Sequence, residues 1–71
     1  SMKEQQEYLI SALPGVGLGM ARLLLKELGS VKKLVNCNEE NLVKIKGVGK
    51  KTSERIVNLF DKEYVECDKK R

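Results

Sequence analysis

The sequence contains no histidine and no tryptophan, and only one proline, two cysteines and three aromatic residues among 71 positions. Without histidine it lacks the side chain that most often acts as a general base near neutral pH. Cys37 and Cys67 are two lone thiols, too few for the four ligands of a structural zinc site. Glu39-Glu40 suits a helix start, where acidic side chains are favoured, and lies near no nucleophile. We therefore expect no catalytic residue, no metal and no cofactor.

The two cysteines are interpreted as free thiols, with a disulfide between them as the alternative. Cys37 is expected to be half-buried at a helix end, and Cys67 to lie in a polar tail. The Ser1-Met2 start resembles a residue left by protease cleavage before an engineered start. We therefore expect a domain cut from a larger protein, and Ser1 is left out of the fold prediction.

Long apolar runs are also missing, and what remains is a small, basic chain. No stretch approaches the ~20 apolar residues of a membrane-spanning helix, and no signal peptide is visible, so we expect an intracellular protein without membrane contact. The net charge of +4 favours anionic partners. A domain of this size buries only roughly 60% of its unfolded surface, so helices must pack well or a partner must help.

The chain does contain one short stretch that occurs twice. Leu13-Pro14-Gly15-Val16-Gly17 (the first hairpin) and Ile45-Lys46-Gly47-Val48-Gly49 (the second hairpin) are 32 residues apart, and flanking apolar residues match at the same offset. Two glycines around a valine allow a tight turn with φ > 0, while the valine points inward. Small Ala21 and Ser53, four positions after each second glycine, let two helices approach closely. The repeat predicts a helix-hairpin-helix unit used twice.

The periodicity of the apolar residues predicts an all-α fold of five short helices without strands. They are placed at residues 3–12, 18–28, 31–36, 39–44 and 50–64. They form two pseudo-symmetric units, residues 4–28 and 39–64, joined by the connector 31–36 within a domain of residues 3–65, before a charged tail of residues 66–71. Pro14 ends the first helix, and Gly29 suits the C-terminal end of the second. Ser30 and Asn38 are the expected N-caps of the next two.

The same periodicity predicts which side chains face the core. These are Tyr8, Leu9, Ala12 and Leu13; Ala21, Leu24, Leu25 and Leu28; Val31, Leu34 and Val35; Leu42, Val43 and Ile45; and Thr52, Ile56, Leu59 and Phe60. Leu23 falls nearly opposite the stripe of its helix, beside Met20. It is either a solitary exposed leucine or an oligomer contact.

The glycine hairpins also predict an anion site. A helix that starts at a glycine turn bares N–H groups and partial positive charge, which favours phosphate. Lys44, Lys46, Lys50, Lys51 and Arg55 surround the second hairpin against Glu54, whereas only Arg22 is basic near the first. The alternative is that the glycines serve only a tight αα-hairpin and the lysines only a solvated face.

The doubling of the pattern favours the phosphate interpretation, strongly for the second hairpin and modestly for the first. Backbone donors and lysines contact phosphates without reading bases, so we expect DNA binding without sequence preference. The predicted DNA-binding residues are Gly15, Gly17, Gly19, Arg22, Lys46, Gly47, Val48, Gly49, Lys50, Lys51 and Arg55.

Three stretches carry a resemblance to a known family: residues 6–10, the first hairpin, and residues 24–31, Leu24-Leu25-Lys26-Glu27-Leu28-Gly29-Ser30-Val31. Over about residues 8–64 the chain resembles the C-terminal domain of the XPF family of structure-specific endonucleases, above all the archaeal Hef helicase/nuclease. The resemblance implies binding to branched or junction DNA and pairing into dimers. It also implies a parent protein whose nuclease site lies in a separate domain.

Two alternatives stay open beside this resemblance. The bacterial excinuclease UvrC ends in a similar tandem, and a mainly protein-binding scaffold with weak DNA affinity is the other. Family members often carry a basic residue just after the first hairpin, where this chain has Leu18-Gly19-Met20. This departure weakens the expected phosphate contact there.

Pairing into a homodimer is implied by the resemblance and by surplus apolar surface. The predicted interface residues are Met20, Leu23, Leu59, Phe60 and Tyr64. In the alternative, Phe60 fills the centre of the monomer and Leu23 is a stray exposed residue.

Overall fold

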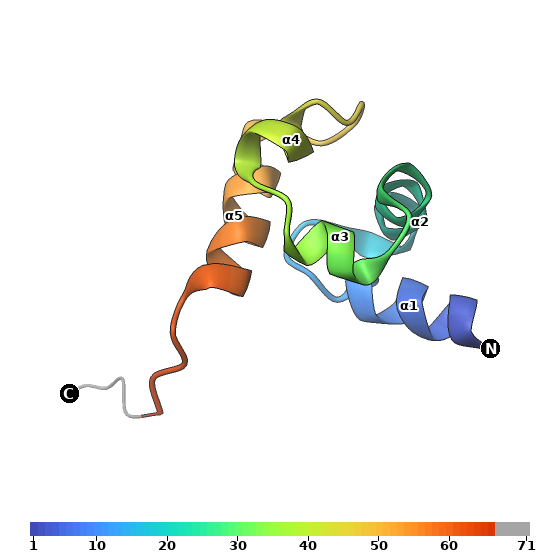
Figure 1. Ribbon diagram of the computed structural model, residues 1–71, viewed down its shortest axis with the longest axis horizontal. Helices are drawn as coiled ribbons and strands as arrows, with labels where there is room; N and C mark the ends of the chain where they lie inside the picture. Colours follow the sequence, from blue (N-terminus) through green and yellow to red (C-terminus); the bar gives the residue numbers. More distant parts are fainter. Residues whose placement is uncertain (67–71) are drawn as a thin grey trace.

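The computed structural model describes residues 1–66, in which five helices and no strand are found. They are α1 (Met2–Ser11), α2 (Gly17–Leu28), α3 (Val31–Val35), α4 (Glu39–Val43) and α5 (Lys50–Asp61). Helix α1 packs against α2 and α4 against α5, with α3 between the two pairs (Figure 1). The predicted all-α fold is confirmed. The predicted charged tail, apart from Glu66, and Cys67 lie outside the described residues.

Three of the helices begin at a side-chain cap. The Ser30 hydroxyl accepts the Lys33 N–H at 3.0 Å, and Asn38 Oδ1 accepts the Asn41 N–H at 2.8 Å, as predicted. At α1 the cap is Ser1, whose hydroxyl accepts the Glu4 N–H at 3.3 Å. Ser1, which was left out of the fold prediction, thus satisfies a backbone donor of the first turn.

The core repeats at the same offset as the sequence. Four buried pairs are separated by 32 residues: Ile10 and Leu42, Val16 and Val48, Ala21 and Ser53, Leu24 and Ile56. Leu34 of the connector α3 completes the buried cluster, which runs through both units. The two units therefore share one hydrophobic core, in which each half supplies matching side chains.

Several side chains predicted to be buried are exposed. On α1 the buried face is Glu7 and Ile10, whereas Tyr8 is 80% and Leu9 58% exposed, and Ala12 is also exposed. The same holds for Val35, Val43 and Leu59. Helices α3 and α4 have five residues each, so each buries a single side chain, Leu34 and Leu42.

Helix α5 ends earlier than predicted. It stops at Asp61, and Lys62 is already extended with ψ 139°. Phe60 is half-buried against the core, and the described residues beyond it are exposed. Since packing provides most of a helix's stability in a protein, α5 ends where its core contacts end. Tyr64, placed by the prediction at the end of this helix, instead lies in the extended segment.

None of the helices in residues 1–66 has the length and the apolar character that crossing a membrane requires.

Candidate functional site

Both hairpins are closed by the same backbone hydrogen bond. The Val16 N–H donates to the Leu13 carbonyl at 3.1 Å, and the Val48 N–H donates to the Ile45 carbonyl at 3.0 Å. Both valine side chains are buried, as predicted. Val48, which the sequence placed among the DNA contacts, therefore has its side chain in the core and its N–H in the turn. It anchors the loop and offers no donor to a ligand.

The first glycines of the two hairpins have the same backbone conformation, whereas the second glycines differ in φ. Gly15 and Gly47 both have positive φ, at 74° and 95°, which L side chains rarely adopt. Gly17 is also left-handed, at 71°, whereas Gly49 has φ −84° and ψ 171° and is the N-cap of α5. A Cβ placed on Gly49 would meet no atom within 4 Å. The start of α5 is therefore open to a ligand.

The helices that follow the hairpins, α2 and α5, begin without a side-chain cap, unlike the other three. In α5 the first N–H with a backbone acceptor is that of Ser53, which donates to the Gly49 carbonyl at 3.0 Å. Within residues 1–66, the N–H groups of Lys50, Lys51 and Thr52 have no acceptor. These donors carry the partial positive charge of the helix N-terminus and are free to bind an anion.

Ser53 stabilises the second hairpin through a side-chain hydrogen bond that was not predicted. Its buried hydroxyl donates to the Gly49 carbonyl at 2.9 Å, one turn earlier. At the matching position of the first unit, buried Ala21 has no hydroxyl to do this. The prediction assigned Ser53 only a small size. A serine aligned with an alanine in a repeat was the available signal.

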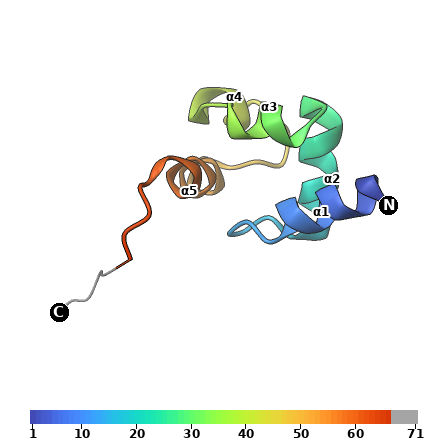
Figure 2. The same cartoon turned by 60° about the horizontal axis from the view of Figure 1, so that its bottom comes forward.

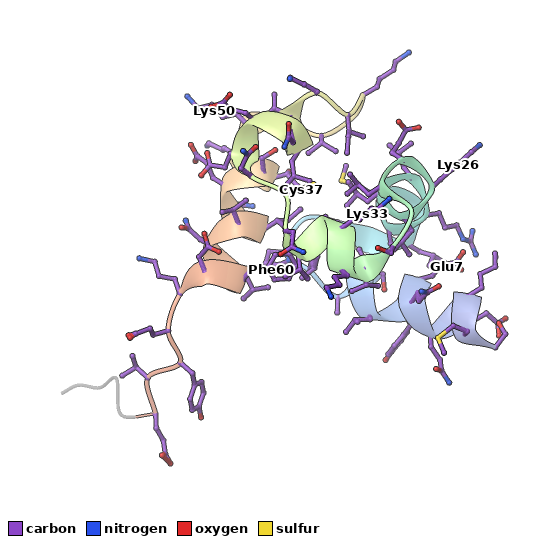
Figure 3. All side chains as sticks on the ribbon, viewed as in Figure 1. Glu7, Lys26, Lys33, Cys37, Lys50 and Phe60 are labelled. Atoms are coloured by element: carbon purple, nitrogen blue, oxygen red, sulfur yellow. The ribbon has the colours of Figure 1, made fainter. Side chains whose placement is uncertain are left out.

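The cations of the second hairpin are exposed, and Lys50 points outward from the start of α5 (Figure 3). These cations are Lys44, Lys46, Lys50, Lys51 and Arg55. In the part of the chain that the structure describes, none of the five has a carboxylate oxygen within 4.0 Å of its basic nitrogens. Arg55 lies on the side of α5 that faces the first hairpin, where it lines a shallow hollow with Pro14 and Leu59. The second hairpin thus combines free N–H donors with unpaired positive charge.

The first unit differs because its cation is already paired. Arg22 Nε lies 3.4 Å from Glu7 Oε1, and Lys3 Nζ lies 3.0 Å from Glu7 Oε2. The Lys3 hydrogen bond and that of Arg22 lower the pKa of Glu7, although burial opposes them. The sequence prediction missed Glu7. Its i, i+3 spacing to buried Ile10 was the available signal.

Each hairpin rests against the second helix of the other unit. A Cβ on Gly47 would lie 3.7 Å from Leu23 Cδ2, and one on Gly15 would lie 3.8 Å from Thr52 Oγ1. The first hairpin reaches toward α5 in Figure 2. Leu23 is half-buried and packs beside the second hairpin, so it is not a stray exposed residue.

The other predicted interface residues divide into two groups. Met20 and Phe60 are half-buried against the core of the monomer, and neither belongs to its fully buried cluster. Leu59 is 52% exposed and Tyr64 is 89% exposed. Only these two of the five offer substantial free surface.

No cluster of three His, Cys, Asp or Glu that could hold a metal ion occurs in residues 1–66. Cys37 is a half-buried free thiol just after α3.

Two glycine hairpins in matching turns, each opening a helix without a cap and both sharing one core, define a tandem helix-hairpin-helix domain. Residues 7–60 match the family described as the SAM-like helix-hairpin-helix tandem, and the chain belongs to this family.

Relatives and solved structures extend this finding. The chain is 39% identical over 64 residues to a protein of Methanocaldococcus jannaschii named as an ATP-dependent RNA helicase, covering 90% of the chain and 8% of that protein. It is 33% identical over 57 residues to UvrABC system protein C of Methanococcoides burtonii, covering 80% of the chain and 9% of that protein. The chain therefore spans less than a tenth of either relative.

Among solved structures, XPF from Aeropyrum pernix in complex with DNA is similar, with a TM-score of 0.84 and 26% identity. The match covers 90% of this chain and 32% of that one. Another structure of the same XPF matches with a TM-score of 0.86 over 92% of this chain and 34% of that one. The predicted resemblance to the XPF family is confirmed.

Proposed function

We propose that this domain binds DNA through the phosphate backbone, without sequence preference, and that the second hairpin is its main contact. The observation that carries the proposal is the uncapped start of α5, whose first turn carries the exposed Lys50 and Lys51, neither of them paired with a carboxylate within the described residues. The similar XPF from Aeropyrum pernix was solved in complex with DNA, which supports the choice of ligand. We further propose that residues 3–65 serve as the DNA-binding module of a larger repair nuclease or helicase that acts on forks, flaps or junctions.

In this mechanism a phosphate oxygen accepts hydrogen bonds from the free N–H groups at the start of α5. Gly49 presents no side chain, so the phosphate can approach closely, while the Lys50 and Lys51 ammonium groups supply charge. Helix N-termini and lysines bind phosphates in this way without contacting base edges. The first hairpin offers backbone donors at Gly17 and Gly19, but the cation of its own unit, Arg22, is paired with Glu7, so its contact is expected to be weaker.

Replacing Gly49 by Asp tests this site directly, because stability and binding should move in opposite directions. The φ and ψ of Gly49 suit an N-cap residue, and its Cβ would meet no atom within 4 Å. An Asp cap accepts hydrogen bonds from the free N–H groups of α5. The free energy of unfolding should therefore rise by a few tenths up to about 1 kcal/mol. The same carboxylate occupies the phosphate site, so DNA affinity should fall at least roughly tenfold, or about 1.4 kcal/mol.

The matched control is Asn41→Asp, which adds the same charge in the first turn of α4, where Asn38 already caps the helix. Its affinity for DNA should fall far less than that of Gly49→Asp, since the added carboxylate is exposed to solvent and lies outside the uncapped first turn of α5. Thermal unfolding and fluorescence anisotropy with a labelled fork DNA measure the two quantities. Equal losses of affinity in both variants would show that the start of α5 is not the contact.

We also propose that the domain pairs into a homodimer, which would let two second hairpins hold separate arms of a junction. A shallow hollow of about 550 Å³ combines the exposed Leu59 and Tyr64 with Pro14 of the first hairpin, and Val65 nearby is 61% exposed. The expected result is a dimer mass in analytical ultracentrifugation at ~100 μM, where an interface of standard size is formed. Leu59→Glu should return the sample to monomer. A monomer mass for the unchanged chain at that concentration contradicts the homodimer.

A further inference from the structure

We propose that Glu7 is a built-in counter-anion, which keeps the cations of the first unit away from DNA and so makes the two hairpins unequal. This inference rests on the proposed DNA binding and names the residue that limits it. Glu7 is buried between α1 and α2, with its side chain only 9% exposed, and holds one cation on each oxygen. Figure 3 shows Glu7 on the side of α1 that faces α2. A phosphate can reach these cations only in competition with the carboxylate.

The side chains around Glu7 are positively charged, as they are at an anion-binding site. A hollow of about 400 Å³ between α1 and α2 is lined by Lys3, Gln6, Glu7, Arg22, Leu25 and Lys26. Three cations thus surround one carboxylate. The side chains of Lys3 and Arg22 are 77% and 57% exposed, so their donors also face solvent. Without the negative charge of Glu7, they would be available to an external phosphate.

The second unit shows what happens without this pairing. The residue 32 positions after Glu7 is Glu39, which lines a different hollow with Glu40, Lys44 and Lys50. Glu39 nevertheless has no basic nitrogen within 4.0 Å among the described residues. The position that matches Arg22 is occupied by Glu54. Both units therefore carry a carboxylate at this place, but only in the first does it hold cations.

A buried carboxylate with two partners could instead serve stability alone, since burial of a charge is unfavourable without pairing. The two roles differ in a measurable way. A purely structural Glu7 contributes to unfolding free energy but leaves DNA affinity unchanged when the fold is kept. A counter-anion changes both the affinity and the number of phosphates contacted.

The test is Glu7→Gln, which keeps the size and one of the two oxygen acceptors, for either Lys3 or Arg22, but removes the charge. Its DNA affinity should rise roughly threefold or more, and the slope of log K against log salt should steepen by about 0.9 for each added phosphate on duplex DNA. The control is Glu27→Gln on the exposed surface of α2, with the same change in net charge. It should change affinity less than about twofold, with an unchanged slope.

Arg22→Gln completes the experiment in both backgrounds. The gain from Glu7→Gln should disappear in the double variant, because Arg22 is the cation released. In the otherwise unchanged chain, Arg22→Gln should cost less than about twofold, as expected for a cation already paired. This arm needs no substitution at Glu7, so a large cost for Arg22→Gln overturns the inference even if Glu7→Gln fails to fold.

Three results overturn the inference: equal gains from Glu7→Gln and Glu27→Gln, a loss of affinity in folded Glu7→Gln, or a cost for Arg22→Gln as large as that of Lys50→Gln. A loss in folded Glu7→Gln would mean that the carboxylate orients Arg22 for phosphate. Failure of every variant and of the unchanged chain to bind DNA would instead overturn the proposed function itself.

Discussion

Replacing Lys50 and Lys51 together by Glu is expected to abolish measurable DNA binding. Both residues lie in the first turn of α5, where the N–H groups are uncapped, and neither is paired with a carboxylate within the described residues. The double change reverses two charges at the phosphate site and adds two carboxylates that compete for its donors. Acidic residues stabilise a helix N-terminus, so the fold should be retained. Fluorescence anisotropy with fork and duplex DNA measures the loss.

The control for this variant is Lys32→Glu with Lys33→Glu, which makes the same charge change in the first turn of α3. That helix is capped by Ser30 and follows no glycine hairpin. Affinity should fall far less, and circular dichroism should show that both double variants keep their helices. A single change, Arg22→Glu, should also weaken binding less than the Lys50 and Lys51 pair, because Arg22 is held by Glu7.

In the unchanged chain, affinity should fall with salt by about 0.9 log units per log unit for each neutralised phosphate on duplex DNA. It should be similar for duplexes of different sequence. Equal losses from the two hairpins would contradict the asymmetry between them.

The second large effect concerns the repeated core. Leu24 and Ile56 occupy matching positions in α2 and α5, and both are completely buried. Truncation of such a side chain to Ala costs about 2–5 kcal/mol through lost burial and the cavity left behind. At about 0.05–0.15 kcal/mol per residue, the whole stability of a chain this short is only about 4–11 kcal/mol. Leu24→Ala and Ile56→Ala should therefore each leave the chain partly or wholly unfolded at 37 °C. Urea unfolding followed by circular dichroism measures this loss of stability.

Leu9→Ala is the control for these variants, because Leu9 is a leucine that the periodicity placed in the core and that the fold exposes. It should change the free energy of unfolding by less than about 0.5 kcal/mol. A cost for Leu9→Ala as large as that for Leu24→Ala would mean that α1 packs through a different face from the one that carries Glu7 and Ile10.

The repeat of Gly-Val-Gly at an offset of 32 residues carried most of what could be predicted about this protein. A glycine pattern constrains the local backbone, so it predicted both turns, the inward valines and the starts of α2 and α5. Because the second unit repeats the first, it also predicted that small Ala21 and Ser53 let the two helices of each unit approach closely. The clustering of lysines near the second hairpin is likewise a property of sequence position alone. These features depend on residues close together in the chain, which is why a single sequence sufficed.

Contacts between distant segments decided the rest. Glu7 pairs with Arg22 only because α1 folds back on α2, and Leu23 found a partner only because the second hairpin lies beside it. Helix α5 ends where its contacts with the shared core end, although its sequence could continue as helix to Tyr64. Periodicity shows that a helix has an apolar face, but not how far a neighbour covers that face. The sequence therefore shows that more cations lie near the second hairpin than near the first. Only the tertiary structure pairs Arg22 with Glu7, which increases this difference in free charge.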